Sequence, residues 1–210
     1  MVNINILSER YATPEINRIF SREGKILAER DLWIAVMIAQ RELGLNIPAE
    51  DIQKFEDAKE KIDLDRIDAL ESVSKHDVQA RKEAYIEVAK AGQHLHKGMT
   101  SRDLTDNVEQ MQFRDAARII FGRNVSILRH MLDNALKYEN YVLTARTHLQ
   151  PAQPTLLGRR FSMWAEELLL HLKNFERFIE GYPLRELKEQ LELNLTCLLY
   201  LKETKVKLLD

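Results

Sequence analysis

The amino-acid sequence predicts an all-α protein, and three observations lead to that prediction. Apolar residues recur at intervals of three and four along most of the chain, which is the spacing of one helix face. No segment alternates apolar and polar residues in the manner of a half-buried strand. The 210 residues include only 7 Gly and 5 Pro, too few for a sandwich or barrel with a turn roughly every 8–12 residues.

Five helical segments are expected, and most have a recognisable start or stop signal. Gly44 follows the first segment, Pro48 fits the first turn of the second, and the third stops before Gly92. The fourth is the longest and would span roughly 50 Å at 1.5 Å per residue. Pro154 and Gly181 flank the fifth. The expected segments are residues 25–43, 48–55, 64–90, 103–138 and 155–179.

Helices of this length are typical of bundles. We therefore expect a small N-terminal helical domain over residues 1–97, followed by a long-helix bundle domain over residues 98–210. The boundary falls near two glycines, Gly92 and Gly98.

Composition excludes several classes of protein. The 31 Lys and Arg residues nearly balance 33 Asp and Glu, for a net charge of −2, so no basic surface for nucleic acid is expected. No apolar run approaches the roughly 20 residues of a membrane span, and the N-terminus lacks the pattern of a secretory signal. A single cysteine, Cys197, cannot form an internal disulfide and favours a reducing compartment. We expect a cytoplasmic protein with no nucleic-acid or membrane partner.

Two polar clusters could bind anions, although each also has a simpler interpretation. Arg10 and Tyr11 combine a planar charged fork with a hydroxyl, which would suit a phosphate, but an N-terminal Arg is more often only solvated. Residues 74–77, Ser-Lys-His-Asp, lie within the third expected helix. Lys75 could hold an anion there and His76 could exchange a proton, but a solvated helix surface is the more common explanation.

Two further segments precede long helices. Thr100 and Asp103 have capping-box spacing, and the free N–H groups of a helix start could also bind a carboxylate or phosphate. Residues 144–155 form a polar segment, expected to be a loop, that needs hydrogen-bond partners or a ligand. His148 is the only ring within it that exchanges protons near pH 7. His94 and His96 are two residues apart, which is more often chance than a metal site, and no metal is expected.

Taken together, four segments resemble the adenylosuccinate lyase family of the fumarase/aspartase superfamily. They are SERYATPE at 8–15, SKHDV at 74–78, GMTSRD at 98–103 and RTHLQPAQPT at 146–155. Their order and separation match the N-terminal half of that family, from about residue 8 to residue 185. The THLQPAQ and TS-x-D segments are typical of the superfamily, whereas SERY and KHD favour this family over argininosuccinate lyase or fumarase.

The resemblance implies elimination of fumarate from adenylosuccinate to give AMP, and from the succinyl-carboxamide ribotide of purine synthesis, without a cofactor. It implies a homotetramer with shared active sites, in the helical-bundle fold of the superfamily. By the same resemblance, Arg10 and Tyr11 would hold the substrate phosphate, and Lys75, His76 and Asp77 would bind substrate. Thr100 and Ser101 would hold the succinyl part. His148 would be the general acid, with Thr147 and Gln153 as its neighbours.

The resemblance ends at Arg185. The family continues Gly-Ile-Lys-Gly-Ala-Val-Gly-Thr-Gln, whereas this chain reads ELKEQLELN from residue 186. Codons allowed for these nine residues, reread one base out of register, encode the family segment. We therefore expect residues 186–202, including Cys197, to arise from a frameshift, either in the gene or in its sequencing. The family's catalytic Ser lies on a later loop, so the 210-residue chain is expected to be inactive by itself.

Two other functions fit the sequence. The chain could be a different lyase of the same superfamily, or a non-catalytic helical remnant that only assembles or binds nucleotide. Four intact site segments in the family's order favour the adenylosuccinate lyase interpretation over the remnant for the parent protein.

Overall fold

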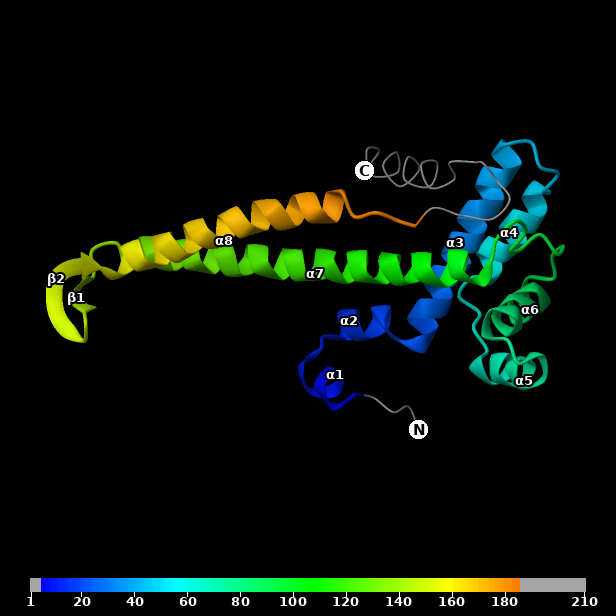
Figure 1. The fold of residues 1–210 in the computed structure, drawn as a ribbon, viewed down its shortest axis with the longest axis horizontal. Coiled ribbons are helices and arrows are strands. Elements are labelled where there is room, and N and C mark those ends of the chain that lie inside the picture. The colour runs from blue at the N-terminus through cyan, green and yellow to red at the C-terminus, as the bar shows by residue number, and fades with distance from the viewer. Residues whose placement is uncertain (1–4, 186–210) are drawn as a thin grey trace. The chain divides into compact units, whose positions relative to one another are not determined.

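The structure is a computed structural model that describes residues 5–185. Over these residues it contains eight helices and one two-stranded sheet (Figure 1). The elements are α1 (Ile6–Tyr11), α2 (Pro14–Ile19), α3 (Arg22–Glu42), α4 (Ala49–Ala58), α5 (Leu64–Ser74), α6 (Asp77–Ala89), α7 (Ser101–Lys137), β1 (Val142–Thr147), β2 (Gln150–Leu156) and α8 (Leu157–Glu180). The all-α fold class is confirmed, because the sheet is one small hairpin. The frameshift expected at 186–202, with Cys197, lies outside the described residues.

The chain divides into two compact units. Over the described residues, the first contains residues 5–113 together with residues 183–185, and the second is Arg114–Tyr182. The boundary therefore falls within α7. The expected division into domains 1–97 and 98–210 stays a prediction.

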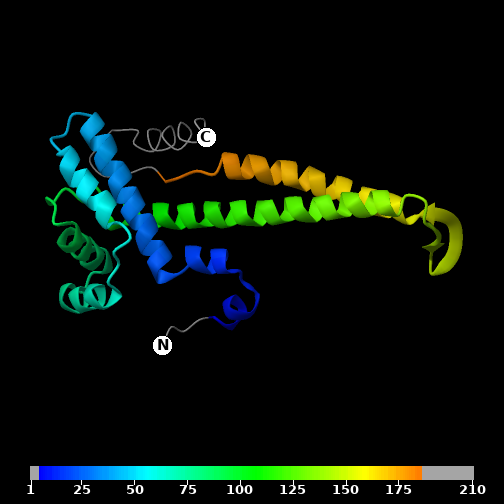
Figure 2. The same cartoon turned by 180° about the vertical axis from the view of Figure 1, so that it is seen from behind.

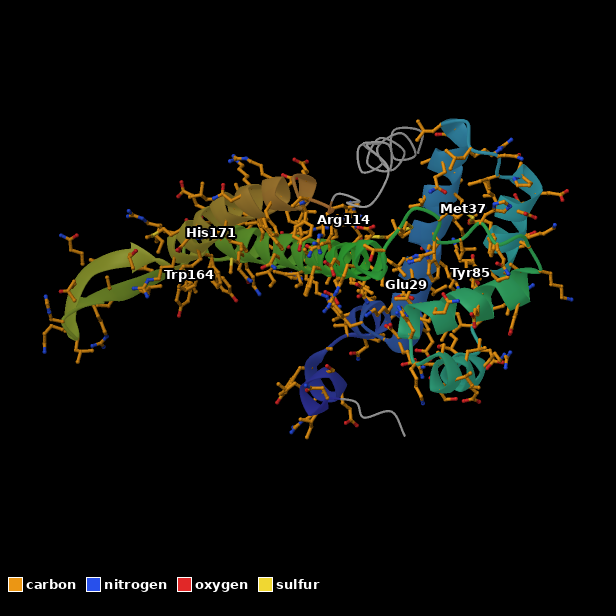
Figure 3. All side chains as sticks on the ribbon, turned by 45° about the vertical axis from the view of Figure 1, so that its right-hand side comes forward. Glu29, Met37, Tyr85, Arg114, Trp164 and His171 are labelled. Carbon is orange, nitrogen blue, oxygen red and sulfur yellow. The ribbon has the colours of Figure 1, made fainter. Side chains whose placement is uncertain are left out.

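The core of the first unit is built on α3. Ser21 begins this helix, because its hydroxyl accepts a hydrogen bond from the Gly24 N–H at 2.9 Å. After the helix ends, Gly44 adopts a left-handed φ of +93°, which confirms the stop signal expected there. Trp33 and Met37 on α3 are almost completely buried, and Figure 3 labels Met37 in this core. The core residues are Leu32, Trp33, Ile34, Val36, Met37, Ala39, Ile47, Phe55, Ala58, Val78, Tyr85, Ala89, Leu95, Met99, Leu104 and Val108.

The single helix expected over residues 64–90 was wrong. The segment forms two helices, α5 and α6, which lie side by side (Figure 1). Lys75 ends α5 in the left-handed conformation, at φ 55°, and His76 is the N-cap of α6. No Gly or Pro marks this break. The Ser-Lys-His-Asp cluster therefore lies at a helix junction, and not within a helix as expected.

The second unit pairs the part of α7 after Arg114 with α8, and Figure 2 shows these two segments side by side. The pairing is antiparallel, because the Phe121 ring lies near that of Phe175, at a tilt, while the Tyr138 ring stacks near that of Phe161. Gly158 permits the close approach at one end, since a Cβ on it would lie 2.4 Å from the carbonyl oxygen of Ala135.

The loop expected over residues 144–155 was also wrong, because this segment is a β-hairpin. β1 and β2 pair antiparallel, from Val142 opposite Leu156 to Thr147 opposite Gln150. A bulge lies where the partner of Thr144 is Pro154 and that of Arg146 is Pro151, so two residues of β2 oppose one of β1. Because β2 extends to Leu156, the last helix begins at residue 157 and not at residue 155 as expected.

The hairpin turn has two residues, His148 and Leu149, with φ of 46° and 64°. Positive φ at both positions is the pattern of a type I′ turn, which normally carries Asn and Gly. Two prolines in β2 are tolerated because each strand of a two-stranded ribbon pairs on one side only. Because of the unusual turn residues and the two prolines, sequence patterns do not predict this hairpin.

No helix among residues 5–185 is both long enough and apolar enough to cross a membrane.

Candidate functional site

Two of the sequence motifs meet in the first unit. The Nε2 atom of His76 lies 3.4 Å from Oγ of Ser101, the first residue of α7. The two residues are 25 positions apart in the chain, so this proximity is a property of the fold. The other ring nitrogen, Nδ1, accepts a hydrogen bond from the Gln79 N–H at 3.3 Å and thereby caps α6. His76 therefore has a defined orientation at the point where the starts of α6 and α7 meet.

Asp77 follows His76 as the first residue of α6. Its Oδ1 lies 3.7 Å from Nδ1 of His76, and its Oδ2 accepts a hydrogen bond from Nη2 of Arg81 at 2.9 Å. Burial of the Asp77 carboxyl acts to raise its pKa. The hydrogen bonds from Arg81 and the Val78 N–H, with the charges of Arg81 and His76, outweigh burial and hold the pKa below its usual range. Asp77 therefore supplies a negative charge beside the His76 ring.

Lys75 is exposed at the end of α5. Its side chain borders an open hollow of about 450 Å³ that Asp68, Glu71 and Ser72 also line. The hollow contains two carboxylates, one of which, Asp68, is paired with Arg22. Lys75 is placed beside His76 by the chain itself, and its ammonium group is accessible to an anion from solvent.

The start of α7 confirms half of the expected capping box. Oδ2 of Asp103 accepts a hydrogen bond from the Thr100 N–H at 2.9 Å. Asp103 is buried, while Thr100 and Ser101 are partly exposed. The carboxylate of Asp103 faces back toward the helix start, so the hydroxyls of Thr100 and Ser101 are the groups that a ligand could reach.

Arg10 and Tyr11 lie in the short helix α1 of the first unit. The guanidinium carbon of Arg10 is 5.7 Å from the centroid of the Tyr11 ring, and both residues are exposed. The pair forms the C-terminal end of this six-residue helix. A guanidinium beside a phenol hydroxyl is suited to a phosphate.

The second unit carries the remaining candidates on its hairpin. His148 occupies the first turn position, Thr147 is the last residue of β1, and Gln153 lies in β2 at the bulge. All three side chains are exposed. Nη1 of Arg146 donates a hydrogen bond to the Leu149 carbonyl at 3.3 Å, which ties the turn to its own strand. The hairpin thus presents a ring able to exchange a proton at its tip.

Sequence reasoning missed Arg81. Its spacing of four from Asp77 is a detectable signal for a helix ion pair. Its other contact, an Nε atom 2.6 Å from Oε2 of the fully buried Glu29 on α3, has no local signature because 52 positions separate the residues.

No group of three or more His, Cys, Asp or Glu side chains within residues 5–185 is arranged to hold a metal ion. His94 and His96 have separate partners. Nε2 of His94 lies 3.5 Å from Oδ2 of Asp51, whereas Nδ1 of His96 accepts a hydrogen bond from Nε1 of Trp33 at 3.1 Å.

A protein-family model described as Lyase matches residues 13–188 of this chain. The chain belongs to the lyase family. Curated relatives named adenylosuccinate lyase support this membership: the chain is 34% identical to that of Schistosoma mansoni over 174 residues, 35% to that of Saccharomyces cerevisiae over 186, and 34% to that of Methanocaldococcus jannaschii over 178. These matches cover 82%, 87% and 82% of the chain and place it in the fumarase/aspartase superfamily.

Solved structures agree on the fold of this lyase family member. The β-carboxy-cis,cis-muconate cycloisomerase of Acinetobacter calcoaceticus matches 96% of the chain and 50% of its own, with a TM-score of 0.74 and 21% identity. The fumarate lyase of a Mesorhizobium species matches 92% of the chain and 47% of its own, with a TM-score of 0.72 and 22% identity. The chain spans 36–39% of the length of the three curated relatives named above.

Proposed function

We propose that this chain is part of a lyase that eliminates fumarate from adenylosuccinate to give AMP, and from the succinyl-carboxamide ribotide. The support is the lyase family match together with relatives that are named adenylosuccinate lyase. In this reaction a carbon-bound proton is removed, the carbon–nitrogen bond breaks, and the departing nitrogen takes up a proton. The proposal includes a place in purine biosynthesis and a cytoplasmic location.

The observation that supports the proposal most directly is the contact between His76 and Ser101. The KHD and TS motifs are separate segments of the sequence, and a lyase needs its substrate-binding groups within reach of one another. In the proposed roles, Lys75, His76 and Asp77 bind substrate, and Thr100 with Ser101 holds the succinyl part. The partly exposed hydroxyls at the start of α7 suit this role, since carboxylates bind well at helix N-termini.

His148 is proposed as the general acid that protonates the leaving nitrogen. Its exposed position on a two-residue turn leaves the ring free to meet a substrate. Thr147 and Gln153 lie on the same hairpin and are proposed as its neighbours. Arg10 and Tyr11, on α1, are proposed to hold the substrate phosphate.

We also propose that the whole protein is a homotetramer with shared active sites. Apolar side chains remain exposed over the second unit, including Leu136 at 71% and Leu170 at 61%. Large exposed apolar surfaces usually mark interfaces, and a two-stranded hairpin is marginal in water without further packing. The exposed apolar residues of the two paired helices are Ile120, Val125, Ile127, Leu132, Leu136, Met163, Trp164, Leu169, Leu170 and Phe178.

Fumarate release tests the proposed function. It is measured with adenylosuccinate for the 210-residue chain and for the longest product of its gene, which also tests the expected inactivity of the chain alone. Release by the longest product, reduced about 100-fold or more in His148→Gln, would support the proposal. The matched control is His171→Gln, an exposed histidine on α8 with no proposed role (Figure 3). A folded longest product that binds no AMP and releases no fumarate would contradict the proposal.

A further inference from the structure

A buried ion pair lies next to Asp77, the residue that follows His76 at the start of α6. Glu29 on α3 is fully buried, and the Arg81 side chain, on α6, is only 12% exposed (Figure 3 labels Glu29). Nε of Arg81 lies 2.6 Å from Oε2 of Glu29 as an ion pair, without the alignment of a good hydrogen bond. Oε1 of Glu29 has no hydrogen-bond partner within residues 5–185. Burial raises the pKa of Glu29, against the opposing effect of Arg81.

Stability alone does not account for this pair. Removing two charges from water costs about as much as their attraction returns, and apolar replacements of buried ion pairs are often equally stable. The unpartnered carboxylate oxygen adds to the cost. A pair that contributes little net stability is better explained by the geometry that it imposes on its neighbours.

The same guanidinium reaches outward from this pair to the site. Nη2 of Arg81 donates a hydrogen bond to Oδ2 of Asp77 at 2.9 Å, while its Nε faces Glu29. Because the guanidinium is planar, fixing one edge against α3 also fixes the direction of the other edge. A lysine ammonium carries the same charge but has no such plane.

The contacts continue from Asp77 to both motifs. Oδ1 of Asp77 lies 3.7 Å from Nδ1 of His76, and Nε2 of His76 lies 3.4 Å from Oγ of Ser101. Five side chains on three helices and one helix cap therefore connect the interior of α3 to the start of α7.

We propose that Arg81, held by Glu29, is a positioning residue that holds the Asp77 carboxylate on its guanidinium. Held there, Asp77 does not accept a proton from Nδ1 of His76, so Nδ1 continues to accept the Gln79 N–H and Nε2 faces Ser101. The relevance of this orientation to fumarate elimination rests on the proposed function. The orientation itself does not, so the two can be tested apart.

The orientation is tested by NMR on the 210-residue chain. Two-bond ¹H–¹⁵N correlations of the histidine rings are recorded above pH 8 or so, where His is ordinarily neutral, and His76→Asn assigns the His76 signals. Because Nδ1 accepts the Gln79 N–H, we expect the ring proton on Nε2 in the wild type. In Arg81→Lys we expect these signals to shift toward a mixture of both tautomers. Glu29→Gln should cause a smaller change in the same direction.

The matched control is Arg66→Lys. Arg66 also holds a carboxylate with two of its nitrogens, at 2.9 and 2.7 Å from Glu87, but this exposed pair reaches neither motif. We expect the control to leave the His76 signals unchanged. Circular dichroism establishes which variants fold. Unchanged His76 signals in either folded variant, Arg81→Lys or Glu29→Gln, would overturn the proposal.

Activity provides the second measurement. If the longest gene product releases fumarate, Arg81→Lys should lower kcat/KM about 10- to 100-fold, as expected when a substrate-positioning group is misplaced, while Arg66→Lys should not. Shifted His76 signals with unchanged kcat/KM would overturn the link to the reaction. If the wild type releases no fumarate, the proposed function fails, and the NMR result still decides whether Arg81 positions His76.

Discussion

Arg30 reaches across the core to Tyr85, with its guanidinium carbon 4.2 Å from the centroid of the ring. The Arg30 side chain is almost completely buried on α3, and its Nη1 donates hydrogen bonds to three carbonyls at the end of α4. The acceptors are Ala58 at 3.1 Å, Lys59 at 2.7 Å and Lys61 at 3.1 Å. Carbonyls at a helix end lack partners within the helix, so one buried cation closes α4 and supports the aromatic ring beside it.

Replacing Arg30 should therefore destabilise the first unit. Arg30→Met leaves three carbonyls without their donor, and we expect the free energy of unfolding to fall by about 2–4 kcal/mol. Urea unfolding followed by tryptophan fluorescence measures the change, in a Trp164→Phe background that leaves Trp33 as the sole reporter. Arg41→Met on the same helix is the control, since Arg41 is exposed and its loss should cost less than about 0.5 kcal/mol. Equal stability of Arg30→Met and the wild type would contradict this account.

Glycines at two positions in the second unit should respond in opposite directions to alanine. In Gly158→Ala the new Cβ meets backbone atoms of Ala135 at 2.4 Å and Glu139 at 2.8 Å, and we expect a loss of about 1–3 kcal/mol. Gly122 lies within α7, and a Cβ there meets nothing within 4 Å. Gly122→Ala should therefore gain about 0.5–1 kcal/mol from helix propensity. Denaturant midpoints compare the two, and a stabilising Gly158→Ala would refute the close approach.

The sequence was sufficient to predict the features set by local chemistry. The stop at Gly44 and the backbone hydrogen bond of Asp103 at the start of α7 both follow from nearby residues. The break at Lys75 does not, because a lysine in the left-handed conformation leaves no compositional mark. The hairpin could not be predicted either, because its turn is His148-Leu149 and not Asn-Gly, the pair that normally indicates a two-residue turn.

For the candidate site, the sequence supplied the residues but not their association. His76 and Ser101 come together only because α6 and α7 start at the same place in the first unit. The sequence does not predict that Glu29 pairs with Arg81, because a charged residue in a helical pattern is normally solvated. Contacts over long separations depend on packing, which periodicity alone does not specify.

Acid should destabilise the first unit through His96. Burial lowers the pKa of the His96 ring from its ordinary value of 6.5; nearby Lys82 and His76 lower it further, whereas Asp103 acts in the opposite direction. Below pH 6.5 the unfolded chain therefore binds the proton more readily than the folded protein does. Stability should be greatest above pH 6.5 and fall as the pH drops from there toward the lower folded-state pKa.

The variant His96→Asn tests this assignment. Asn tolerates the left-handed φ of 66° found at this position but does not titrate. The unfolding free energy of the variant should depend less on pH between 6.5 and 5 than that of the wild type. Identical pH profiles for the two proteins would show that another group causes the acid sensitivity.

The hairpin turn should be stabilised by a residue that accepts its backbone conformation. Leu149 has a φ of 64° and is 88% exposed, so its side chain contributes strain without compensating burial. Leu149→Gly should stabilise the hairpin by about 0.5–1 kcal/mol, because glycine has no Cβ to clash in the left-handed region. Leu149→Val is the opposed control, since a branched Cβ is the least tolerant of positive φ. Hydrogen exchange of the β1 amides measures both effects: protection should rise in the glycine variant and fall in the valine variant, and the reverse order would contradict the assigned turn.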